Sequence, residues 1–351
     1  MMMGSLKDEI LPFTAMVMVE IAEVGMVTLS KAALTTGMSN SVFVVYYNSL
    51  GTFILFLYFL FQSHRSRRPL TFTLLCRFFL IGLLGIFLVQ NLSLIGIKYS
   101  SPTLATAMGN LIPGFTFLLA VTFRMEKLAR SRRSSQAKII GTIVSITGAF
   151  IVTLYKGQPI VKVSSFNNSS FELPLLQKSN WVLGGLFFTF TCLSSATWSI
   201  VQAATLKEYP EKMTLVFFSC LFGTIQCAVF SLIAERNINA WILNSGIQVI
   251  ATIYSAIFVT AFRSSIIAWC LQKKGPVYVA LFKPLSTAIA VVMAMMFLGE
   301  TPHLGGLIGA AIIALGFYTV MWGKAKEKDI TAGNMCSLES STEHTPLIQS
   351  N

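Results

Sequence analysis

Charged residues lie well inside some apolar stretches of this chain. Glu20 and Glu23 lie in the first apolar run, and Arg263 and Lys283 lie in two later ones. An ionised side chain is costly in a hydrocarbon interior unless it is paired or faces water or a protein-lined cavity. A carboxylate can bind a substrate ammonium, and a cation can bind a substrate carboxylate. These residue types therefore predict the recognition of a small charged solute.

The two glutamates have two readings that the sequence leaves open. We expect one of them to line a pathway, where it accepts a substrate ammonium or carries a proton. The alternative is a structural role, as the fixed partner of an interior cation such as Lys283 or Arg263.

Lys283 stands next to Pro284 in the apolar run from Gly275 to Glu300. If the span begins at Lys274, Lys283 lies about 10–12 Å deep, and Pro284 cannot donate the next helical hydrogen bond. We expect the Lys283 ammonium to receive a substrate carboxylate. A Lys283→Met chain is then expected to insert normally and to lose transport.

Asn110 and Pro113 interrupt the fourth apolar run as Lys283 and Pro284 interrupt the ninth. Paired interruptions of this kind are typical of discontinuous helices whose freed backbone groups meet a ligand. A simple proline kink is the alternative.

Further polar residues are predicted in the interior. Gln90 and Asn91 correspond, 174 positions on, to Ser264 and Ser265. These groups are expected either to orient a zwitterion or to join helices by hydrogen bonds. Trp198 and Gln202 in the sixth apolar run are two more candidates for the pathway.

Other charged residues are expected at boundaries or gates. Lys31 is predicted either to reach the interface with its long side chain or to act in a gate, and Arg263 is expected to reach the interface. Glu126 and Glu300 occupy equivalent places in the repeat described below and are interpreted as boundary or gate elements.

The composition predicts a polytopic membrane protein. Of 351 residues 54% are apolar and 11% charged, and the mean hydropathy is +0.70. A soluble domain does not have this balance. We expect an all-α protein with ten transmembrane helices, at about 11–34, 42–62, 74–97, 101–123, 137–155, 181–203, 214–234, 246–271, 276–298 and 303–322.

The basic residues predict the orientation of these spans. With the N-terminus inside, 18 Lys and Arg residues fall on the cytosolic side and 6 on the opposite side. This bias predicts that both termini are cytosolic. The net charge of +12 is thus explained by topology, and no nucleic acid partner is expected.

The chain contains an internal echo. Pro102 and Glu126 recur as Pro276 and Glu300, and Gly51 recurs as Gly223. Because each half has five spans, an odd number, we expect a 5+5 inverted repeat, which is associated with alternating-access transport. The predicted domains are a cytosolic N-terminus (1–10), a first repeat (11–155), a non-cytosolic loop (156–180), a second repeat (181–323) and a disordered cytosolic tail (324–351).

No sequence pattern indicates an enzyme, a cofactor or a metal site. The six cysteines form no CxxC pair, and there are no GxxxxGK[ST], HExxH or GxSxG patterns. We therefore expect no catalytic residues and no nucleotide-driven step.

The loop and the tail carry two short motifs. Asn167 and Asn168 begin overlapping glycosylation acceptors. Glu343, Leu347 and Ile348 form an acidic dileucine-like pattern, which predicts a sorting adaptor as a partner.

Three segments carry a resemblance to a known family: Lys31-Ala-Ala-Leu, Asn110-Leu-Ile-Pro113 and Phe282-Lys283-Pro284-Leu285. Over about residues 10–323 the chain resembles plant drug/metabolite transporters with EamA domains, and within them the walls-are-thin-related, nodulin-21-like (UMAMIT) group. Glu20 and Glu23 do not map onto a general motif of that family.

The resemblance implies a secondary transporter or facilitator of small organic solutes, above all amino acids, in the plasma or vacuolar membrane of a plant. An auxin-type or indole-type carboxylate carrier and a non-transporting membrane scaffold are the alternatives.

Overall fold

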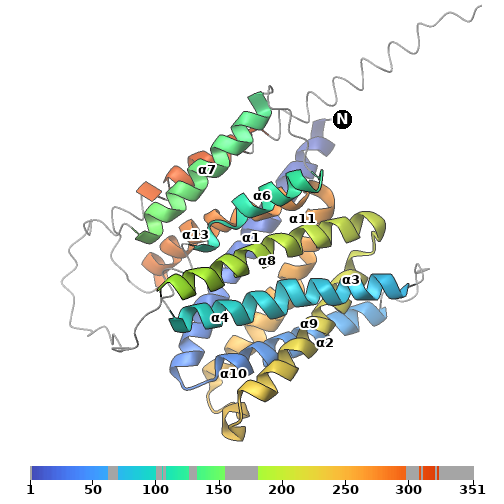
Figure 1. Ribbon diagram of the computed structural model, residues 1–351, viewed down its shortest axis with the longest axis vertical. Coiled ribbons are helices and arrows are strands. Elements are labelled where there is room, and N and C mark those ends of the chain that lie inside the picture. The colour runs from blue at the N-terminus through green and yellow to red at the C-terminus, as the bar shows by residue number, and fades with distance from the viewer. Residues whose placement is uncertain are drawn as a thin grey trace, which may run out of the picture.

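The structure is a computed structural model and describes residues 2–61, 70–99, 105, 108–125, 133–154, 181–297, 308–309, 311–320 and 322–323. These residues form helices joined by short turns (Figure 1). The helices are α1 (Met2–Thr35), α2 (Asn40–Phe61), α3 (Phe72–Gly82), η2 (Leu83–Leu88), α4 (Val89–Tyr99), α6 (Ile112–Thr122), α7 (Arg133–Leu154), α8 (Trp181–Glu208), α9 (Lys212–Ala234), η3 (Ile238–Trp241), α10 (Gly246–Tyr254), η4 (Ser255–Arg263), α11 (Ser264–Lys274), α12 (Pro276–Ala280) and α13 (Phe282–Phe297), with a further helical stretch at 311–320.

Six helices in the described part of the chain are long and apolar enough to cross a membrane. They are Ile10–Thr35, Asn40–Phe61, Phe72–Ile97, Val182–Glu208, Lys212–Ala234 and Gly246–Lys274. Shorter apolar helices cover 112–122, 276–290 and 311–320. A helix thus occupies part of each of the ten predicted stretches. The all-α membrane class is confirmed, while ten spans stay a prediction.

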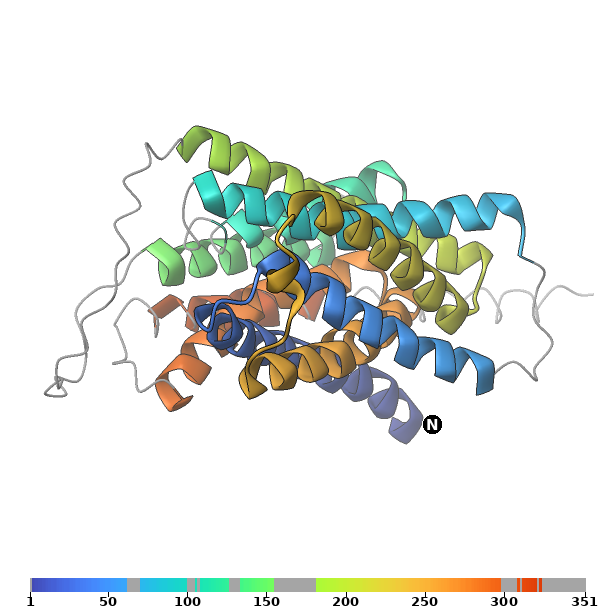
Figure 2. The same cartoon turned by 90° about the horizontal axis from the view of Figure 1, so that it is seen from below.

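The outer surfaces of these helices are apolar. Large side chains such as Val182, Leu232 and Ile233 are 89%, 64% and 69% exposed. A water-soluble protein rarely leaves so much apolar surface uncovered, whereas in lipid a helix satisfies its own backbone groups and presents such side chains outward. The helices therefore pack as a bundle with a lipid-facing exterior, seen from two sides in Figures 1 and 2.

The fourth and ninth predicted spans are both broken. α6 begins at Ile112, directly after a turn at Asn110 and Leu111. α12 ends at Ala280 and α13 begins at Phe282. The second break therefore lies two residues before the predicted position at Lys283. Pro284 is in the first turn of α13, where its missing N–H has no helical acceptor to lose.

Two long helices contain π-helical segments. η2 interrupts the helix from Phe72 to Tyr99, and η4 interrupts the helix from Gly246 to Lys274. Residues 83–88 shifted by the 174 positions of the repeat give 257–262, which lies inside η4 (255–263). π-Helical turns occur often at functional sites. Both segments lie beside the cavities described below.

Glycines allow helices to approach closely at opposite edges of the bundle. A Cβ on Gly82 of α3 would lie 2.7 Å from the backbone oxygen of Ser219 in α9. At the other edge, a Cβ on Gly141 of α7 would lie 2.6 Å from the backbone oxygen of Gly316. Any side chain at these places would separate the helices. α7 lies at one edge in Figure 1, and α2 with α9 at the other.

Candidate functional site

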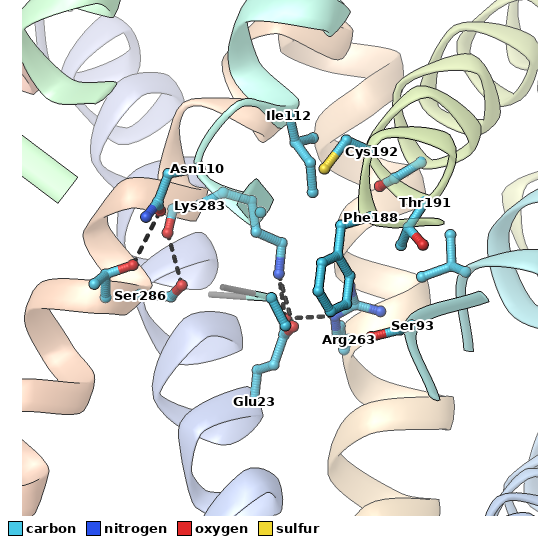
Figure 3. Close-up of a pocket in the computed structure, with 15 residues that line it drawn as sticks. Glu23, Ser93, Asn110, Ile112, Phe188, Thr191, Cys192, Arg263, Lys283 and Ser286 are labelled. Atoms are coloured by element: carbon cyan, nitrogen blue, oxygen red, sulfur yellow. Dashed lines mark hydrogen bonds and ion pairs between the residues drawn. The ribbon is translucent and has the colours of Figure 1, made fainter. Parts of the chain in front are cut away.

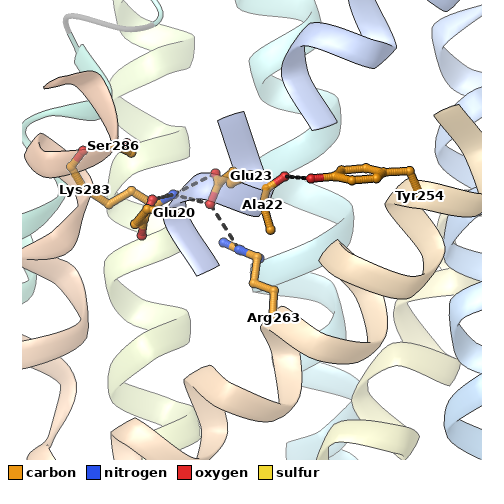
Figure 4. Close-up of polar contacts among 7 residues, drawn as sticks. All are labelled: Glu20, Ala22, Glu23, Tyr254, Arg263, Lys283 and Ser286. Carbon is orange, nitrogen blue, oxygen red and sulfur yellow. Dashed lines mark hydrogen bonds and ion pairs between the residues drawn. The ribbon is translucent and has the colours of Figure 1, made fainter. Parts of the chain in front are cut away.

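Four charged side chains meet where α1, η4 and α13 come together (Figure 4). Lys283 Nζ donates to Oε1 and Oε2 of Glu23, at 2.7 Å each. Arg263 Nε donates to Glu23 Oε2 at 3.1 Å. Lys283 Nζ also lies 3.8 Å from Glu20 Oε2. We call Glu20, Glu23, Arg263 and Lys283 the charge cluster.

Glu23 is the centre of the charge cluster. It pairs with both cations, at 2.7 and 3.1 Å, while the ion pair of Glu20 with Lys283 is longer, at 3.8 Å. Glu20 is 2% exposed, and its Oε2 has no hydrogen-bond partner among the described residues. Lys283 has three donors and Arg263 five, so both can also bind a second acceptor. Within the cluster, Glu23 is thus held firmly and Glu20 loosely.

Local sequence explains why the four side chains converge. Glu20 and Glu23 are three residues apart on α1, which places them on one face of the helix. Tyr254 donates to the backbone oxygen of Ala22 at 3.4 Å and fixes α1 against α10. At the start of α13, Ser286 donates to the backbone oxygen of Lys283 at 2.7 Å.

Aromatic packing holds the first turn of α13 in place. The ring of Phe282 lies 5.0 Å from Phe317, 5.2 Å from Tyr278 and 5.8 Å from Phe13. Such ring pairs stabilise beyond their buried area. The neighbouring Lys283 is thereby held at a fixed depth and direction.

Three residues of the charge cluster, Glu23, Arg263 and Lys283, form one wall of a cavity of about 260 Å³ (Figure 3). We call it the large cavity. Its charged and polar lining consists of Glu23, Ser93, Asn110, Thr191, Ser195, Arg263, Lys283, Ser286 and Thr287. Its remaining lining consists of Val89, Ala105, Gly109, Ile112, Phe188 and Cys192. A hollow in which charged and polar groups converge beside apolar side chains suits a small polar molecule.

Asn110 lines the large cavity at the break before α6. Its Oδ1 accepts a hydrogen bond from Thr287 at 3.1 Å, which ties the break before α6 to α13. Its Nδ2 is buried and has no partner among the described residues. The break therefore offers a free donor beside the cations.

With both glutamates ionised, the charges of the cluster balance. It then has two carboxylates and two cations, all inside the helix bundle. A ligand with one positive and one negative group can exchange with these pairs and keep the balance, whereas a singly charged ligand cannot. Chemically, the site can bind and orient a solute by ion exchange.

The structure brings together the residues singled out in the first, fourth and ninth runs. Glu23, Asn110 and Lys283 line the large cavity, and Glu20 pairs with Lys283 but does not line the cavity. Pro113 is buried in the first turn of α6, and Pro284 lies in the first turn of α13. Glu23 is the partner of a cation and also faces the cavity, so its contacts leave both readings open.

The expectation for Arg263 was wrong. Arg263 does not extend to the interface but binds Glu23 inside the bundle, with its side chain 23% exposed. The π-helical segment η4, which ends at Arg263, turns this residue relative to a continuous α-helix. A depth estimate from residue count alone cannot include that rotation.

Gln90 joins two helices and Asn91 bonds within its own helix, and neither residue lines the large cavity. Gln90 donates to the Tyr47 hydroxyl at 2.7 Å and accepts from Asn48 at 3.4 Å. Asn91 donates to the backbone oxygen of Phe87 at 2.8 Å, inside its own helix. The second of the two predicted roles for Gln90 is therefore the one that its contacts favour.

Trp198, Gln202 and Ser264 line a second, smaller hollow on the far side of Arg263. Ser265 donates to the backbone oxygen of Ala261 at 2.7 Å.

Several lining residues had not been singled out from the sequence. Ser286 and Thr287 follow Lys283 by three and four residues, and this helical spacing was a usable signal. Phe188, Thr191 and Ser195 of α8 carried no such signal, because polar and aromatic residues occur throughout that helix.

Some predicted residues lie outside the described part of the chain. They are Glu126, Glu300, Asn167, Asn168, Glu343, Leu347 and Ile348, together with the side chain of Lys31. Within the described residues, no group of three or more His, Cys, Asp or Glu side chains is placed to hold a metal ion.

The comparisons with known proteins agree with one another. The model of the EamA-like transporter family matches residues 13–154 and again residues 182–322. The WAT1-related protein At5g40240 of Arabidopsis thaliana is 43% identical over 346 residues, which cover 97% of this chain and 92% of that protein. Protein WALLS ARE THIN 1 of Arabidopsis thaliana is 35% identical, with 94% and 87% covered. One solved crystal structure shares the fold, with a TM-score of 0.65, 16% identity and coverage of 88% of this chain and 98% of that one.

Proposed function

The chain belongs to the EamA-like transporter family, a family of membrane transporters of small solutes, and on that premise we propose that its cargo are zwitterionic amino acids. We further propose that it carries them across a plant membrane by alternating access. The observation that carries the proposal is the charge cluster of two carboxylates and two cations, of which Glu23, Arg263 and Lys283 line the large cavity.

The proposed binding step is an exchange of ion pairs. The substrate carboxylate takes a place on Lys283 and Arg263, and the substrate ammonium takes a place on Glu23. The free Nδ2 of Asn110 donates a further hydrogen bond to the carboxylate. Each group that leaves a protein partner gains a substrate partner, so no charge in the membrane interior is left alone.

Charge balance favours zwitterionic amino acids over the alternative cargo, an auxin-type or indole-type carboxylate, which we call the runner-up. An auxin-type or indole-type carboxylate brings one negative charge and leaves the site with a net charge of minus one. An uncompensated buried charge costs about 3–5 kcal/mol, or about two to four orders of magnitude in affinity. The runner-up retains one argument, since the Phe188 ring and the two cations of the large cavity also suit an aromatic carboxylate.

Alternating access is proposed from an inverted repeat of residues 11–155 and 181–323. The two stretches matched by the family model agree with these bounds. Two contacts join positions that are equivalent in the halves: Thr52 Oγ1 lies 3.0 Å from Thr224 Oγ1, and Ser145 Oγ donates to the backbone oxygen of Ile313 at 3.5 Å. A two-fold axis brings equivalent positions into mutual contact in this way.

Glycine contacts support the same two-fold relation. Gly141 and Gly148 correspond to Gly309 and Gly316 at a shift of 168 residues. Gly141 packs on Gly316, while Gly148 packs on Gly309. This exchange of partners is what a two-fold axis requires. The π-helical segments η2 and η4 at equivalent positions add a third sign of duplication.

The proposed orientation has both termini in the cytosol, as the distribution of basic residues indicates. It places the large cavity towards the non-cytosolic face. Glycosylation of Asn167 or Asn168 and recognition of Leu347 and Ile348 by a sorting adaptor remain proposals of the same kind.

Transport of labelled solutes tests the proposal. Cells that express the chain should take up and release labelled neutral amino acids faster than cells with the empty vector, and should show no added flux of labelled indole-3-acetate. Flux of indole-3-acetate alone would favour the runner-up. Flux of neither solute in cells with the protein at the correct membrane would favour a scaffold.

A further inference from the structure

A second hollow of about 80 Å³ lies beyond Arg263. We call it the small cavity. It is enclosed by the middle of the helix from Phe72 to Tyr99, by the second half of α8, by the first part of α9 and by Arg263 with Ser264. The large cavity instead lies towards the other end of α8, around Phe188 and Thr191. The two cavities therefore follow one another along the bundle.

Three residues separate the two cavities. Val89, Ser195 and Arg263 line both of them. Arg263 is the only charged residue of the three, and its Nε pairs with Glu23. Its guanidinium carries five donors, so the remaining ones can face either side.

Two buried polar groups line the small cavity without partners. Gln202 is 3% exposed and Ser219 is 5% exposed. Gln202 Oε1 and Ser219 Oγ have no hydrogen-bond partner among the described residues. A buried polar atom without a partner is costly, so such atoms in a native protein usually meet water or a ligand. A hollow of this volume has room for several water molecules or for the polar head of a small solute.

We propose that the small cavity is a second binding station for the transported solute, and this inference rests on the proposed function. The solute carboxylate stays on Arg263 while the solute moves from one side of the guanidinium to the other. Its ammonium leaves Glu23 and donates to Gln202 Oε1 and Ser219 Oγ. The station therefore selects solutes that have a carboxylate and a hydrogen-bond donor within the reach of one small molecule.

The station predicts an effect that depends on the side of entry. A solute that enters at the end of the bundle where α8 stops and α9 begins meets the small cavity first. This end is cytosolic in the proposed orientation. Removal of the hydrogen-bonding groups should weaken binding from that face and spare binding from the other.

Two variants with matched controls test this prediction. Ser219→Ala and Gln202→Leu are compared with Ser231→Ala and Gln226→Leu, which change the same residue types in α9 but line neither cavity. Efflux and uptake of labelled L-alanine are measured in cells, so that the half-saturating concentration is obtained for each face. Ser219→Ala and Gln202→Leu should each raise that concentration about five- to tenfold at the cytosolic face and less than twofold at the other. The controls should leave both values unchanged.

A native thiol gives a second measurement that does not depend on the rate of transport. Cys220 lines the small cavity, and Cys192 lines the large one. Chains that keep only one of these cysteines are treated with methyl methanethiosulfonate. Saturating L-alanine should slow the modification of both thiols.

The outcomes separate this inference from the proposed function. If the variants leave both half-saturating concentrations unchanged and L-alanine protects Cys192 but not Cys220, the small cavity holds water only and the second station is wrong. If neither thiol is protected and labelled amino acids are not moved, the proposed function itself fails.

Discussion

Replacement of Lys283 by methionine should still allow the chain to insert into the membrane, but it should lower the stability of the folded protein and stop transport. In the parent, two carboxylates face two cations. Lys283→Met removes the only cation that contacts Glu20 among the described residues, and leaves Arg263 as the only cation on Glu23. One negative charge is then unbalanced in the membrane interior. Removal of one partner of a buried ion pair costs about 3–5 kcal/mol.

A second substitution should restore stability without restoring transport. Lys283→Met combined with Glu20→Gln returns the cluster to one carboxylate and one cation, and keeps the 3.1 Å contact between Arg263 and Glu23. A well-packed neutral replacement of a buried pair is often as stable as the pair itself. The double variant should therefore regain most of the lost stability. It should remain inactive because the substrate carboxylate has lost Lys283.

Thermal unfolding of the purified proteins in detergent measures the effect. A loss of about 3–5 kcal/mol corresponds to a fall in Tm on the order of 10 °C. Arg77→Met is the control, because the pair of Arg77 with Glu208 has side chains 35% and 62% exposed. Such a surface pair contributes about 0–1 kcal/mol. If Lys283→Met unfolds at the parental temperature and the double variant gains nothing, the four charges are not coupled.

Two other predictions concern packing and topology. Gly82→Ala should lower the free energy of unfolding by about 1–3 kcal/mol, because its Cβ would meet backbone atoms of Ser219 and Gly223 at 2.7 and 2.8 Å. Gly185→Ala should not lower it, because a Cβ added there would meet no neighbouring element within 4 Å. Equal melting temperatures for the two variants would contradict the close approach of α3 and α9. A protease site inserted after Gly323 should be cleaved only from the cytosol, and cleavage from the opposite side would overturn the inverted repeat.

The sequence predicted those features of the fold that depend on the composition and length of a segment. The apolar runs predicted the helices, and Asn110 with Pro113 predicted the break before α6. The break near Lys283 was displaced to Leu281, because a proline is tolerated in the first turn of a helix. Helix existence is a local property, and so it could be predicted.

The partners within the site were harder to predict because they depend on how helices are rotated and crossed. The charged residues in apolar runs were recognisable as site residues, but the sequence could not decide whether Glu23 holds Lys283, Arg263 or neither. The π-helical segments added a further error. An extra residue in a turn rotates the rest of the helix by about 100°, so Arg263 turned inward and Gln90 turned towards Tyr47.

The central claim is that the charge cluster takes one negative and one positive group of the same solute. Competition experiments test it most directly. Transport of labelled L-alanine, L-glutamine and L-phenylalanine is measured with three unlabelled competitors each: the amino acid, its analogue without the ammonium and its amide without the carboxylate.

For at least one of the three sets, the amino acid should compete at least about a hundredfold more strongly than either analogue, because each analogue leaves one buried charge unpaired. Lys283→Met with Glu20→Gln should transport none of the three labelled amino acids. If the analogue without the ammonium competes as well as the amino acid, the charge cluster recognises a carboxylate alone and does not exchange its ion pairs with a zwitterion.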